Sequence, residues 1–302
     1  MPYRIRPDRP LLDEVQTVAR RELEKAIEAL EARPEGLHAA IHAARKKFKR
    51  LRNLYRLIAT GDKEFRRQEN VRLRDAGRSL SRIRDATALI ETVEHLSDHA
   101  LTDDEAETLD ATRAVLALRR DEIAAEEKDL EAKVEAVVGE CRAAIDALDT
   151  LSLPSKPRLA SRLIAKGWRK GLENAHEALE TCKGESHGEA FHDLRKAAQA
   201  YWMNLSLLRD LWPSAFAAKR NEAKRLVDLL GHEHDLTVLT TLLDHEPETF
   251  GDGEGQSFLL AIIIRRQQDL RREALDLADQ VFADPAKHEA GIVETLWMRA
   301  AT

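Results

Sequence analysis

Residues 41–58 read Ile-His-Ala-Ala-Arg-Lys-Lys-Phe-Lys-Arg-Leu-Arg-Asn-Leu-Tyr-Arg-Leu-Ile. Apolar residues recur here at steps of three and four, the spacing of one helix face. The stretch also holds seven Lys or Arg residues and no acidic residue. Like charges one turn apart repel each other, so the pattern predicts an anionic ligand, with a solvated face paired to other helices as the alternative. The charged side extends about 21 Å and comprises His42, Arg45, Lys46, Lys49, Arg52 and Arg56.

The composition of the whole chain predicts an all-α protein with segregated charge. Of 302 residues, 34% are charged and 43% apolar, and the net charge is −6. Residues 63–84 carry eight Lys or Arg against three acids, whereas residues 91–150 carry eighteen acids against six Lys or Arg. A basic helix or groove under an acidic exterior would discourage indiscriminate anion binding.

Compartment signals favour the cytoplasm. Cys141 and Cys182 lack metal-like spacing and are interpreted as reduced thiols. The first ten residues have no apolar core, so we expect no signal peptide. The longest apolar run, residues 258–264, is too short to span a bilayer.

Helical periodicity continues through almost the whole chain, and Pro and Gly mark its breaks. Residues 152–157, which contain Pro154 and Pro157, predict a linker between two halves of about 1–151 and 158–302. The expected helices cover about 10–33, 37–60, 63–97 and 103–150, then 158–183, 189–211, 214–245, 256–283 and 286–300.

Two motif pairs recur at an offset of 150 residues, which indicates an internal duplication. His42-x-x-Arg45-Lys46 is matched by His192-x-x-Arg195-Lys196. Residues 80–89, with Arg84-Asp85, are matched by residues 230–239, with His234-Asp235. Duplicated halves commonly pack about a pseudo-two-fold axis, so the two basic helices are expected to face one shared groove.

At these motifs the chain resembles the CHAD family, the conserved-histidine α-helical domains. The resemblance extends over nearly the whole chain, as a single CHAD domain of residues 1–302. It implies two four-helix bundles related by pseudo-two-fold symmetry, with a central basic groove that binds inorganic polyphosphate. It further implies association with cytoplasmic polyphosphate granules and their proteins, and no enzyme activity, cofactor, metal or membrane.

The family motif, carried over by position, implies a set of polyphosphate-binding side chains. In the second copy, Gln199 and Ala200 replace the further basic residues of the first, so its charged row is shorter. Candidates to supply the missing charge are Arg78, Arg82, Arg119, Arg120, Arg162, Lys166, Arg169, Arg265 and Arg266. The predicted binding residues are His42, Arg45, Lys46, Lys49, Arg50, Arg52, Arg56, His192, Arg195, Lys196, Arg119, Arg265 and Arg266.

Polyphosphate carries a regular charge repeat and no base edges, so a row of cationic donors suffices to bind it. Arg offers a planar fork and Lys a mobile point charge. An anion nearby would raise the pKa of His42 and His192, which could add charge. Bridging hydrogen bonds between helices are the alternative role for these two imidazoles.

Three other functions stay open from the residues. His192-Asp193, His234-Asp235 and the paired histidines His38/His42 and His232/His234 are compatible with a metal-dependent HD phosphohydrolase, although the basic helix supplies no carboxylate. A nucleic-acid binder would use the same cations, with Trp202 as a stacking platform, but the net charge is negative. The third alternative is a scaffold for a partner enzyme.

Overall fold

Eleven α-helices and two short 3₁₀ helices make up the described part of the chain, which contains no strand. The computed structural model describes residues 3–184, 188–251 and 253–301. The prediction of an all-α protein is confirmed. Among the helices described, none combines the length and the apolar character needed to cross a membrane.

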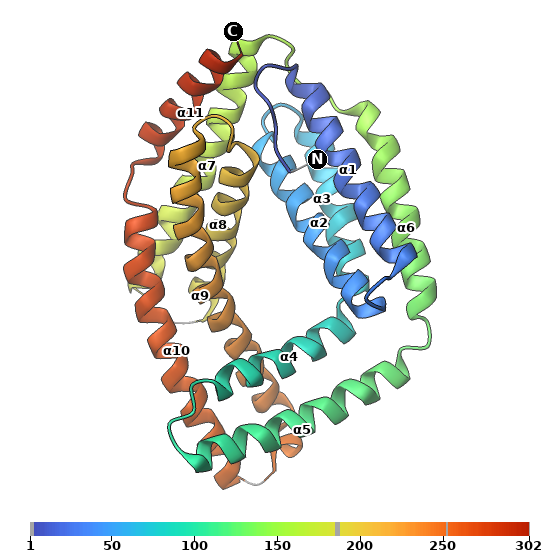
Figure 1. Ribbon diagram of the computed structural model, residues 1–302, viewed down its shortest axis with the longest axis vertical. Helices are drawn as coiled ribbons and strands as arrows, with labels where there is room; N and C mark the ends of the chain where they lie inside the picture. The colour runs from blue at the N-terminus through green and yellow to red at the C-terminus, as the bar shows by residue number, and fades with distance from the viewer. Residues whose placement is uncertain (1–2, 185–187, 252, 302) are drawn as a thin grey trace.

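The first arm of the molecule is a bundle of helices (Figure 1). It buries the apolar stripe of residues 41–58. Ile41, Phe48 and Leu51 are at most 2% exposed. Gly36 has a φ of 87° at the turn before the basic helix, a conformation that favours glycine. The helices of this arm are α1 (Leu11–Ala32), α2 (Leu37–Leu57), α3 (Lys63–Ser79) and α6 (Leu130–Ala147).

The second arm is organised around one buried carboxylate. Glu289, 4% exposed, accepts hydrogen bonds from Trp168 Nε1 at 3.1 Å, Tyr201 Oη at 2.8 Å and Lys219 Nζ at 2.6 Å. The four residues lie on four different helices, so these bonds fix the helices to one another. The arm consists of α7 (Pro157–Gly184), α8 (Gly188–Leu207), α9 (Pro213–His245), α10 (Gly253–Val281) and α11 (Ala286–Ala300).

The two arms meet at the C-terminal ends of α2 and α8. Asn53 Nδ2 donates to Asn204 Oδ1 at 2.8 Å, and both side chains are buried. At Gly167 of α7, a Cβ atom would lie 1.8 Å from the carbonyl oxygen of Leu57, so only glycine permits this approach. The backbone N–H of Ile5 donates to the Leu207 carbonyl at 2.9 Å.

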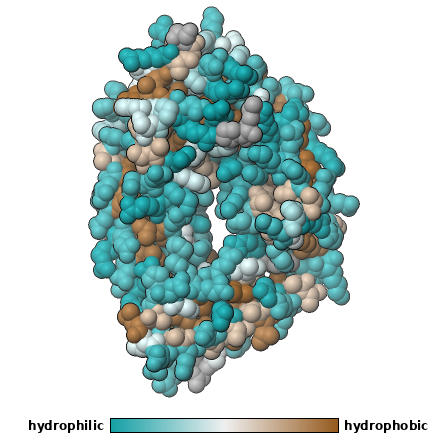
Figure 2. Space-filling model, viewed as in Figure 1, coloured by the Kyte–Doolittle hydropathy of each residue, from teal (hydrophilic) through white to brown (hydrophobic). Residues whose placement is uncertain are grey.

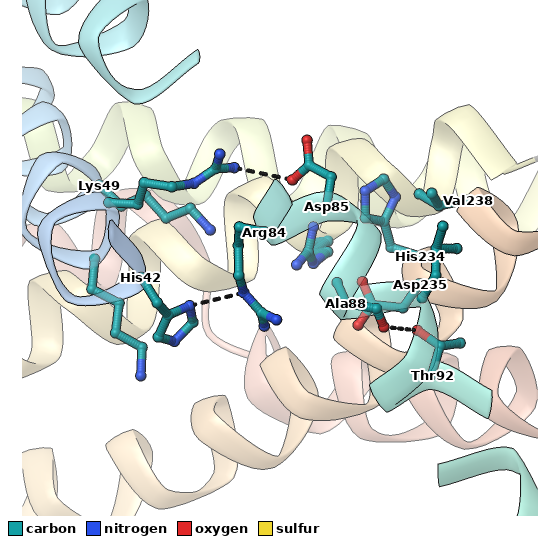
Figure 3. Close-up of a pocket in the computed structure, with 13 residues that line it drawn as sticks. His42, Lys49, Arg84, Asp85, Ala88, Thr92, His234, Asp235 and Val238 are labelled. Atoms are coloured by element: carbon teal, nitrogen blue, oxygen red, sulfur yellow. Dashed lines mark hydrogen bonds and ion pairs between the residues drawn. The ribbon is translucent and has the colours of Figure 1, made fainter. Parts of the chain in front are cut away.

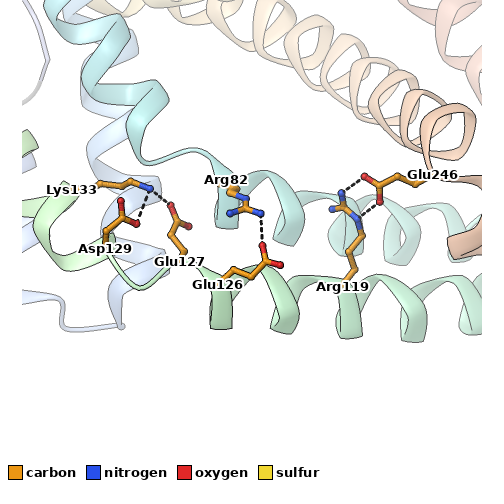
Figure 4. Close-up of polar contacts among 7 residues, drawn as sticks. All are labelled: Arg82, Arg119, Glu126, Glu127, Asp129, Lys133 and Glu246. Atoms are coloured by element: carbon orange, nitrogen blue, oxygen red, sulfur yellow. Dashed lines mark hydrogen bonds and ion pairs between the residues drawn. The ribbon is translucent and has the colours of Figure 1, made fainter.

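At the other end, α4 (Arg82–Ser97) and α5 (Asp103–Glu126) leave the first arm and reach the second (Figure 1). They share a separate apolar core with the adjoining parts of α9 and α10. Arg119 of α5 donates twice to the carboxylate of Glu246, at 2.8 and 2.7 Å, as Figure 4 shows. Arg265 of α10 does the same to Glu105, at 2.5 and 2.8 Å. These contacts close the molecule into a ring.

Two of the expected helices are wrong as single elements. Residues 63–97 break at Leu80 and Ser81 into α3 and α4, and residues 103–150 break at residues 127–129 into α5 and α6. Neither break contains Gly or Pro, and apolar periodicity runs across both because the helices on each side bury a stripe. The second break is held by Lys133, which pairs with Glu127 and Asp129 (Figure 4).

The first half of the described chain therefore holds six α-helices rather than the four expected, whereas the second half holds the expected four and a terminal one. Two of the six belong to the bridge between the arms, so the picture of two self-contained four-helix bundles is too simple. The internal duplication stays a prediction at this point.

Candidate functional site

A cavity of about 390 Å³, called here the central cavity, lies where α2, α4, α8 and α9 meet. Figure 2 shows an opening between the arms, edged by hydrophilic side chains. Five Lys or Arg side chains line the cavity against two carboxylates, so its charge is opposite to that of the chain. The lining comprises His42, Arg45, Lys46, Lys49, Arg84, Asp85, Ala88, Leu89, Thr92, Arg195, His234, Asp235 and Val238 (Figure 3).

Helix α2 brings four of the predicted binding residues to the central cavity: His42, Arg45, Lys46 and Lys49. They share a side because their spacing follows the helical turn. The opposite side of the helix is fixed in the core of the first arm. Burial of the apolar stripe thus determines where the charged side points.

Helix α4 supplies Arg84 and Asp85, which hold the α2 side chains in place. Arg84 donates from Nε to Nδ1 of His42 at 3.2 Å, as Figure 3 shows. Arg45 reaches Asp85 at 3.5 Å and donates to the Gly77 carbonyl at 3.2 Å. Because Nδ1 of His42 accepts this bond, the neutral ring carries its proton on Nε2.

Helices α8 and α9 supply Arg195, His234 and Asp235. The His234 ring stacks on that of His192, with centroids 4.5 Å apart and an interplanar angle of 26°. No hydrogen bond or ion pair joins the Lys49 ammonium or the Arg195 guanidinium to the side chain of another described residue. These two cations are available to a ligand.

Burial and, after it, neighbouring positive charge lower the pKa values of three lining groups. Burial, with Arg195 and Arg45 nearby, lowers the pKa of Lys49 to about 8. Burial, with Arg195 and His192, lowers the pKa of His234 to about 4. The pKa of His42 is also lowered, first by burial and then by Lys46 and Arg84. A bound anion would oppose these shifts, because it offsets the repulsion among the lining cations.

The predicted residues Arg52, Arg56 and Lys196 lie outside the central cavity. Arg52 donates to Asn70 at 3.0 Å, and its pKa is lowered by burial and by Arg56 and other arginines. Arg56 and Lys196 line a separate pocket of about 400 Å³ between α2, α7 and α8. Lys196 already pairs with Asp193 there, at 2.8 Å.

Two more predicted residues are directed elsewhere. Arg50 turns toward α1, where it pairs with Glu22 at 3.2 Å beside Lys47. His192 does not line the central cavity, and its buried Nδ1 atom has no hydrogen-bond partner among the described residues. Burial and the neighbouring Lys196 and Arg195 lower its pKa.

The model of the CHAD domain matches residues 19–244, well over half of the chain. The chain belongs to the CHAD family. No curated protein sequence matches it. The structure of PptA from Streptomyces chartreusis is similar, with a TM-score of 0.60 and 14% identity, over 91% of this chain and 100% of that one. At this identity the similarity is one of fold.

Three of the predicted binding residues, Arg119, Arg265 and Arg266, lie apart from the central cavity. Arg119 and Arg265 are engaged in the bidentate pairs with Glu246 and Glu105 that attach α5 to the second arm. Arg266 lies near His95 and His232, whose pKa values it helps to lower after burial. The structure does not bring these three arginines together with Lys49.

The set predicted from the sequence did not include Arg84, Asp85, His234 and Asp235, which line the cavity. A signal for them was present, because they form the second motif pair at the offset of 150 residues. In the sequence they were interpreted as markers of the repeat, and His234-Asp235 also as a metal pair of the HD type, but not as polyphosphate-binding residues.

A metal site of the HD type would need several convergent His and Asp side chains. Among residues 3–184, 188–251 and 253–301, no group of three or more His, Cys, Asp or Glu side chains is placed to hold a metal ion. His234 and Asp235 instead face the cations of the central cavity.

Proposed function

We propose that this CHAD domain binds inorganic polyphosphate in the central cavity, as the resemblance to its family implies. The observation that carries the proposal is the convergence of Lys49, Arg84 and Arg195, from three different helices, on one cavity. Two of these cations have no partner among the described side chains.

The chemistry of the lining suits a phosphate chain better than a shaped organic ligand. Guanidinium groups bind phosphate oxygens through paired N–H donors, whereas Lys adds a mobile charge. The three cations come from different directions, so successive phosphates of a flexible chain can each meet one. An anion also restores the pKa values of Lys49 and His42 toward their ordinary range, which adds to the binding free energy.

Beyond the cavity, we expect the polymer to continue along α2. From Lys49, Arg52 and Arg56 follow on the same side over about 10 Å. Burial and other arginines, with Arg56 the first of them, depress the pKa of Arg52, which indicates a second region of excess positive charge. A chain long enough to reach both regions would bind more tightly than one confined to the cavity.

We also infer that the two halves descend from one duplicated unit. Asn53 of α2 and Asn204 of α8 hydrogen-bond to each other and occupy nearly equivalent positions of the predicted repeat. Contact between equivalent residues is expected where two related elements cross a two-fold axis. Helix α9, with 33 residues, covers the positions that α3 and α4 divide between them in the first half.

Association with cytoplasmic polyphosphate granules, in a binding rather than a catalytic role, is proposed from the family resemblance alone. The described lining contains no nucleophile placed beside a base, and His42 is engaged by Arg84. Granule association would be tested by the position of a fluorescent fusion in cells that make polyphosphate and in cells that do not.

Binding itself is tested by titrating the purified protein with long-chain polyphosphate at several salt concentrations, with RNA as competitor. We expect tight binding that weakens with salt, with a log–log slope that reflects the number of phosphates engaged. RNA at equal phosphate concentration should not displace the polymer. Absence of binding, or equal competition by RNA, would reject the proposal.

A further inference from the structure

A second basic pocket lies on a different side of α2 from the central cavity, between α1, α2, α8 and α9. Its volume is about 360 Å³, and it shares no lining residue with the central cavity. We call it the Trp202 pocket, after the indole in its wall. Its lining includes Glu22, Lys25, Arg50, Trp202, Arg209 and Arg220.

The two sites are separated by the contact between the arms. Lys49 points into the central cavity, whereas Arg50, one residue on, turns about 100° away and pairs with Glu22 of α1. The buried hydrogen bond between Asn53 and Asn204 joins α2 and α8 where the arms meet. A ligand in one site therefore does not contact the lining of the other.

The Trp202 pocket has an excess of positive charge. Its single carboxylate, Glu22, is buried and already pairs with Arg50 at 3.2 Å and Lys47 at 3.6 Å. The side chains of Lys25, Arg209 and Arg220 make no hydrogen bond or ion pair with any other described residue.

Three other arginines lie near Arg209. Burial lowers its pKa, Asp210 opposes the shift, and Arg4, Arg220 and Arg50 add to it. Asp210 is itself engaged by Arg4 at 3.0 Å. A pocket with this charge, in a chain whose net charge is −6, fits an anion.

The wall of the pocket adds a planar apolar surface. Trp202 is half-buried, and the Lys224 ammonium lies 5.9 Å from the centroid of its ring. A bare phosphate gains no stacking contact from such a surface, whereas a planar ring stacks on it. The volume lies in the range of pockets that hold small molecules, roughly 300–1,000 Å³.

We propose that the Trp202 pocket binds a nucleoside di- or triphosphate. The base stacks against Trp202, and the phosphates lie against Arg209 and Arg220, with Lys25 at the edge of the site. This site is independent of polyphosphate binding in the central cavity.

The test is calorimetric titration of the full chain carrying Lys49→Glu/Arg195→Glu, which removes phosphate binding in the central cavity, with a non-hydrolysable ATP analogue and, separately, with tripolyphosphate, which lacks the base. The further substitutions are made in this background. We expect the analogue to bind about tenfold more tightly, because stacking of a base on an aromatic side chain contributes at this level. Trp202→Leu removes that advantage and leaves the affinity for tripolyphosphate unchanged. Trp202→Phe keeps part of the advantage.

Arg209→Ala/Arg220→Ala should weaken both ligands at least tenfold. Trp212→Leu, which alters an exposed indole outside the pocket, is the matched control and should change neither. The wild-type chain should bind the analogue in this pocket with the same affinity as Lys49→Glu/Arg195→Glu, which separates this site from the central cavity. Equal affinity for the analogue and tripolyphosphate, no binding of either, or an unchanged analogue affinity in Trp202→Leu would overturn the proposal.

Discussion

Polyphosphate affinity should depend on pH through one lysine of the central cavity. In the free protein, burial and the neighbouring Arg195 and Arg45 lower the pKa of Lys49 to about 8. A phosphate beside the ammonium would raise that pKa toward its ordinary value of 10.5. Below pH 8 the ammonium is charged in both states, so the contribution of Lys49 to the affinity is nearly constant there. Above pH 8 the free protein loses the proton and must regain it on binding.

The size of the effect follows from linkage. Between about pH 7 and pH 9 the affinity should fall about tenfold, and near pH 8 each binding event should take up roughly half a proton. Titration calorimetry with long-chain polyphosphate, at constant ionic strength and in two buffers of different ionisation enthalpy, measures both quantities. Internal phosphates of a long chain stay ionised over this range.

Lys49→Arg is the matched control, because a guanidinium keeps its charge throughout this range. The variant should bind polyphosphate with an affinity that stays nearly constant from pH 7 to pH 9. If the wild-type protein shows no loss of affinity, or if Lys49→Arg shows the same loss, the reasoning about Lys49 is refuted.

Three further predictions concern the framework around the cavity. Asn53→Ala leaves the buried Asn204 amide without its partner and should lower the free energy of unfolding by about 1–3 kcal/mol in urea denaturation; an unchanged midpoint would argue against this contact. Gly167→Ala places a methyl group against the Leu57 carbonyl and should cost about 1–3 kcal/mol in the same assay, whereas Gly139→Ala, which meets open space, should not. Arg119→Ala removes the bidentate pair with Glu246 and should speed hydrogen exchange in α5 while polyphosphate affinity changes less than twofold; a larger loss of affinity would place Arg119 in the binding track instead.

Much of the fold was readable from local patterns. The 3–4 spacing of Ile41, Phe48 and Leu51 predicted which side of α2 is buried, and these residues are in the core. The same spacing placed Lys49 on the opposite side, and it lines the cavity. Amphipathic periodicity depends only on the sequence of one helix, which is why the buried side of α2 could be predicted correctly.

The breaks in the long helices were not predictable in this way. Neither Leu80 nor Ser81 is a residue that ends helices by itself. The chain turns here because the apolar side chains of α4 pack against those of α5 and α9. That turn brings Arg84 to His42 across the cavity. Tertiary packing therefore determines the position of Arg84 in the site, which could not be predicted from the sequence.

Long-range pairing also changed the interpretation of charged residues. Arg119 and Arg265 were predicted to bind polyphosphate because their carboxylate partners, Glu246 and Glu105, lie 127 and 160 residues away in the chain and could not be recognised from the sequence. Arg50 belongs to the basic stretch in sequence and to a different pocket in space. No pattern within one helix reports such partners.

The measurement that tests the central claim most directly is polyphosphate binding by Lys49→Glu/Arg195→Glu. Neither side chain is paired with another described residue, so the double variant should fold, which circular dichroism would confirm. Arg113→Glu/Arg225→Glu makes the same change of charge at exposed positions outside the cavity. We predict that the cavity variant loses binding by at least about a hundredfold, which is roughly 3 kcal/mol, while the control loses less than threefold. Equal losses in the two variants would contradict polyphosphate binding in the central cavity.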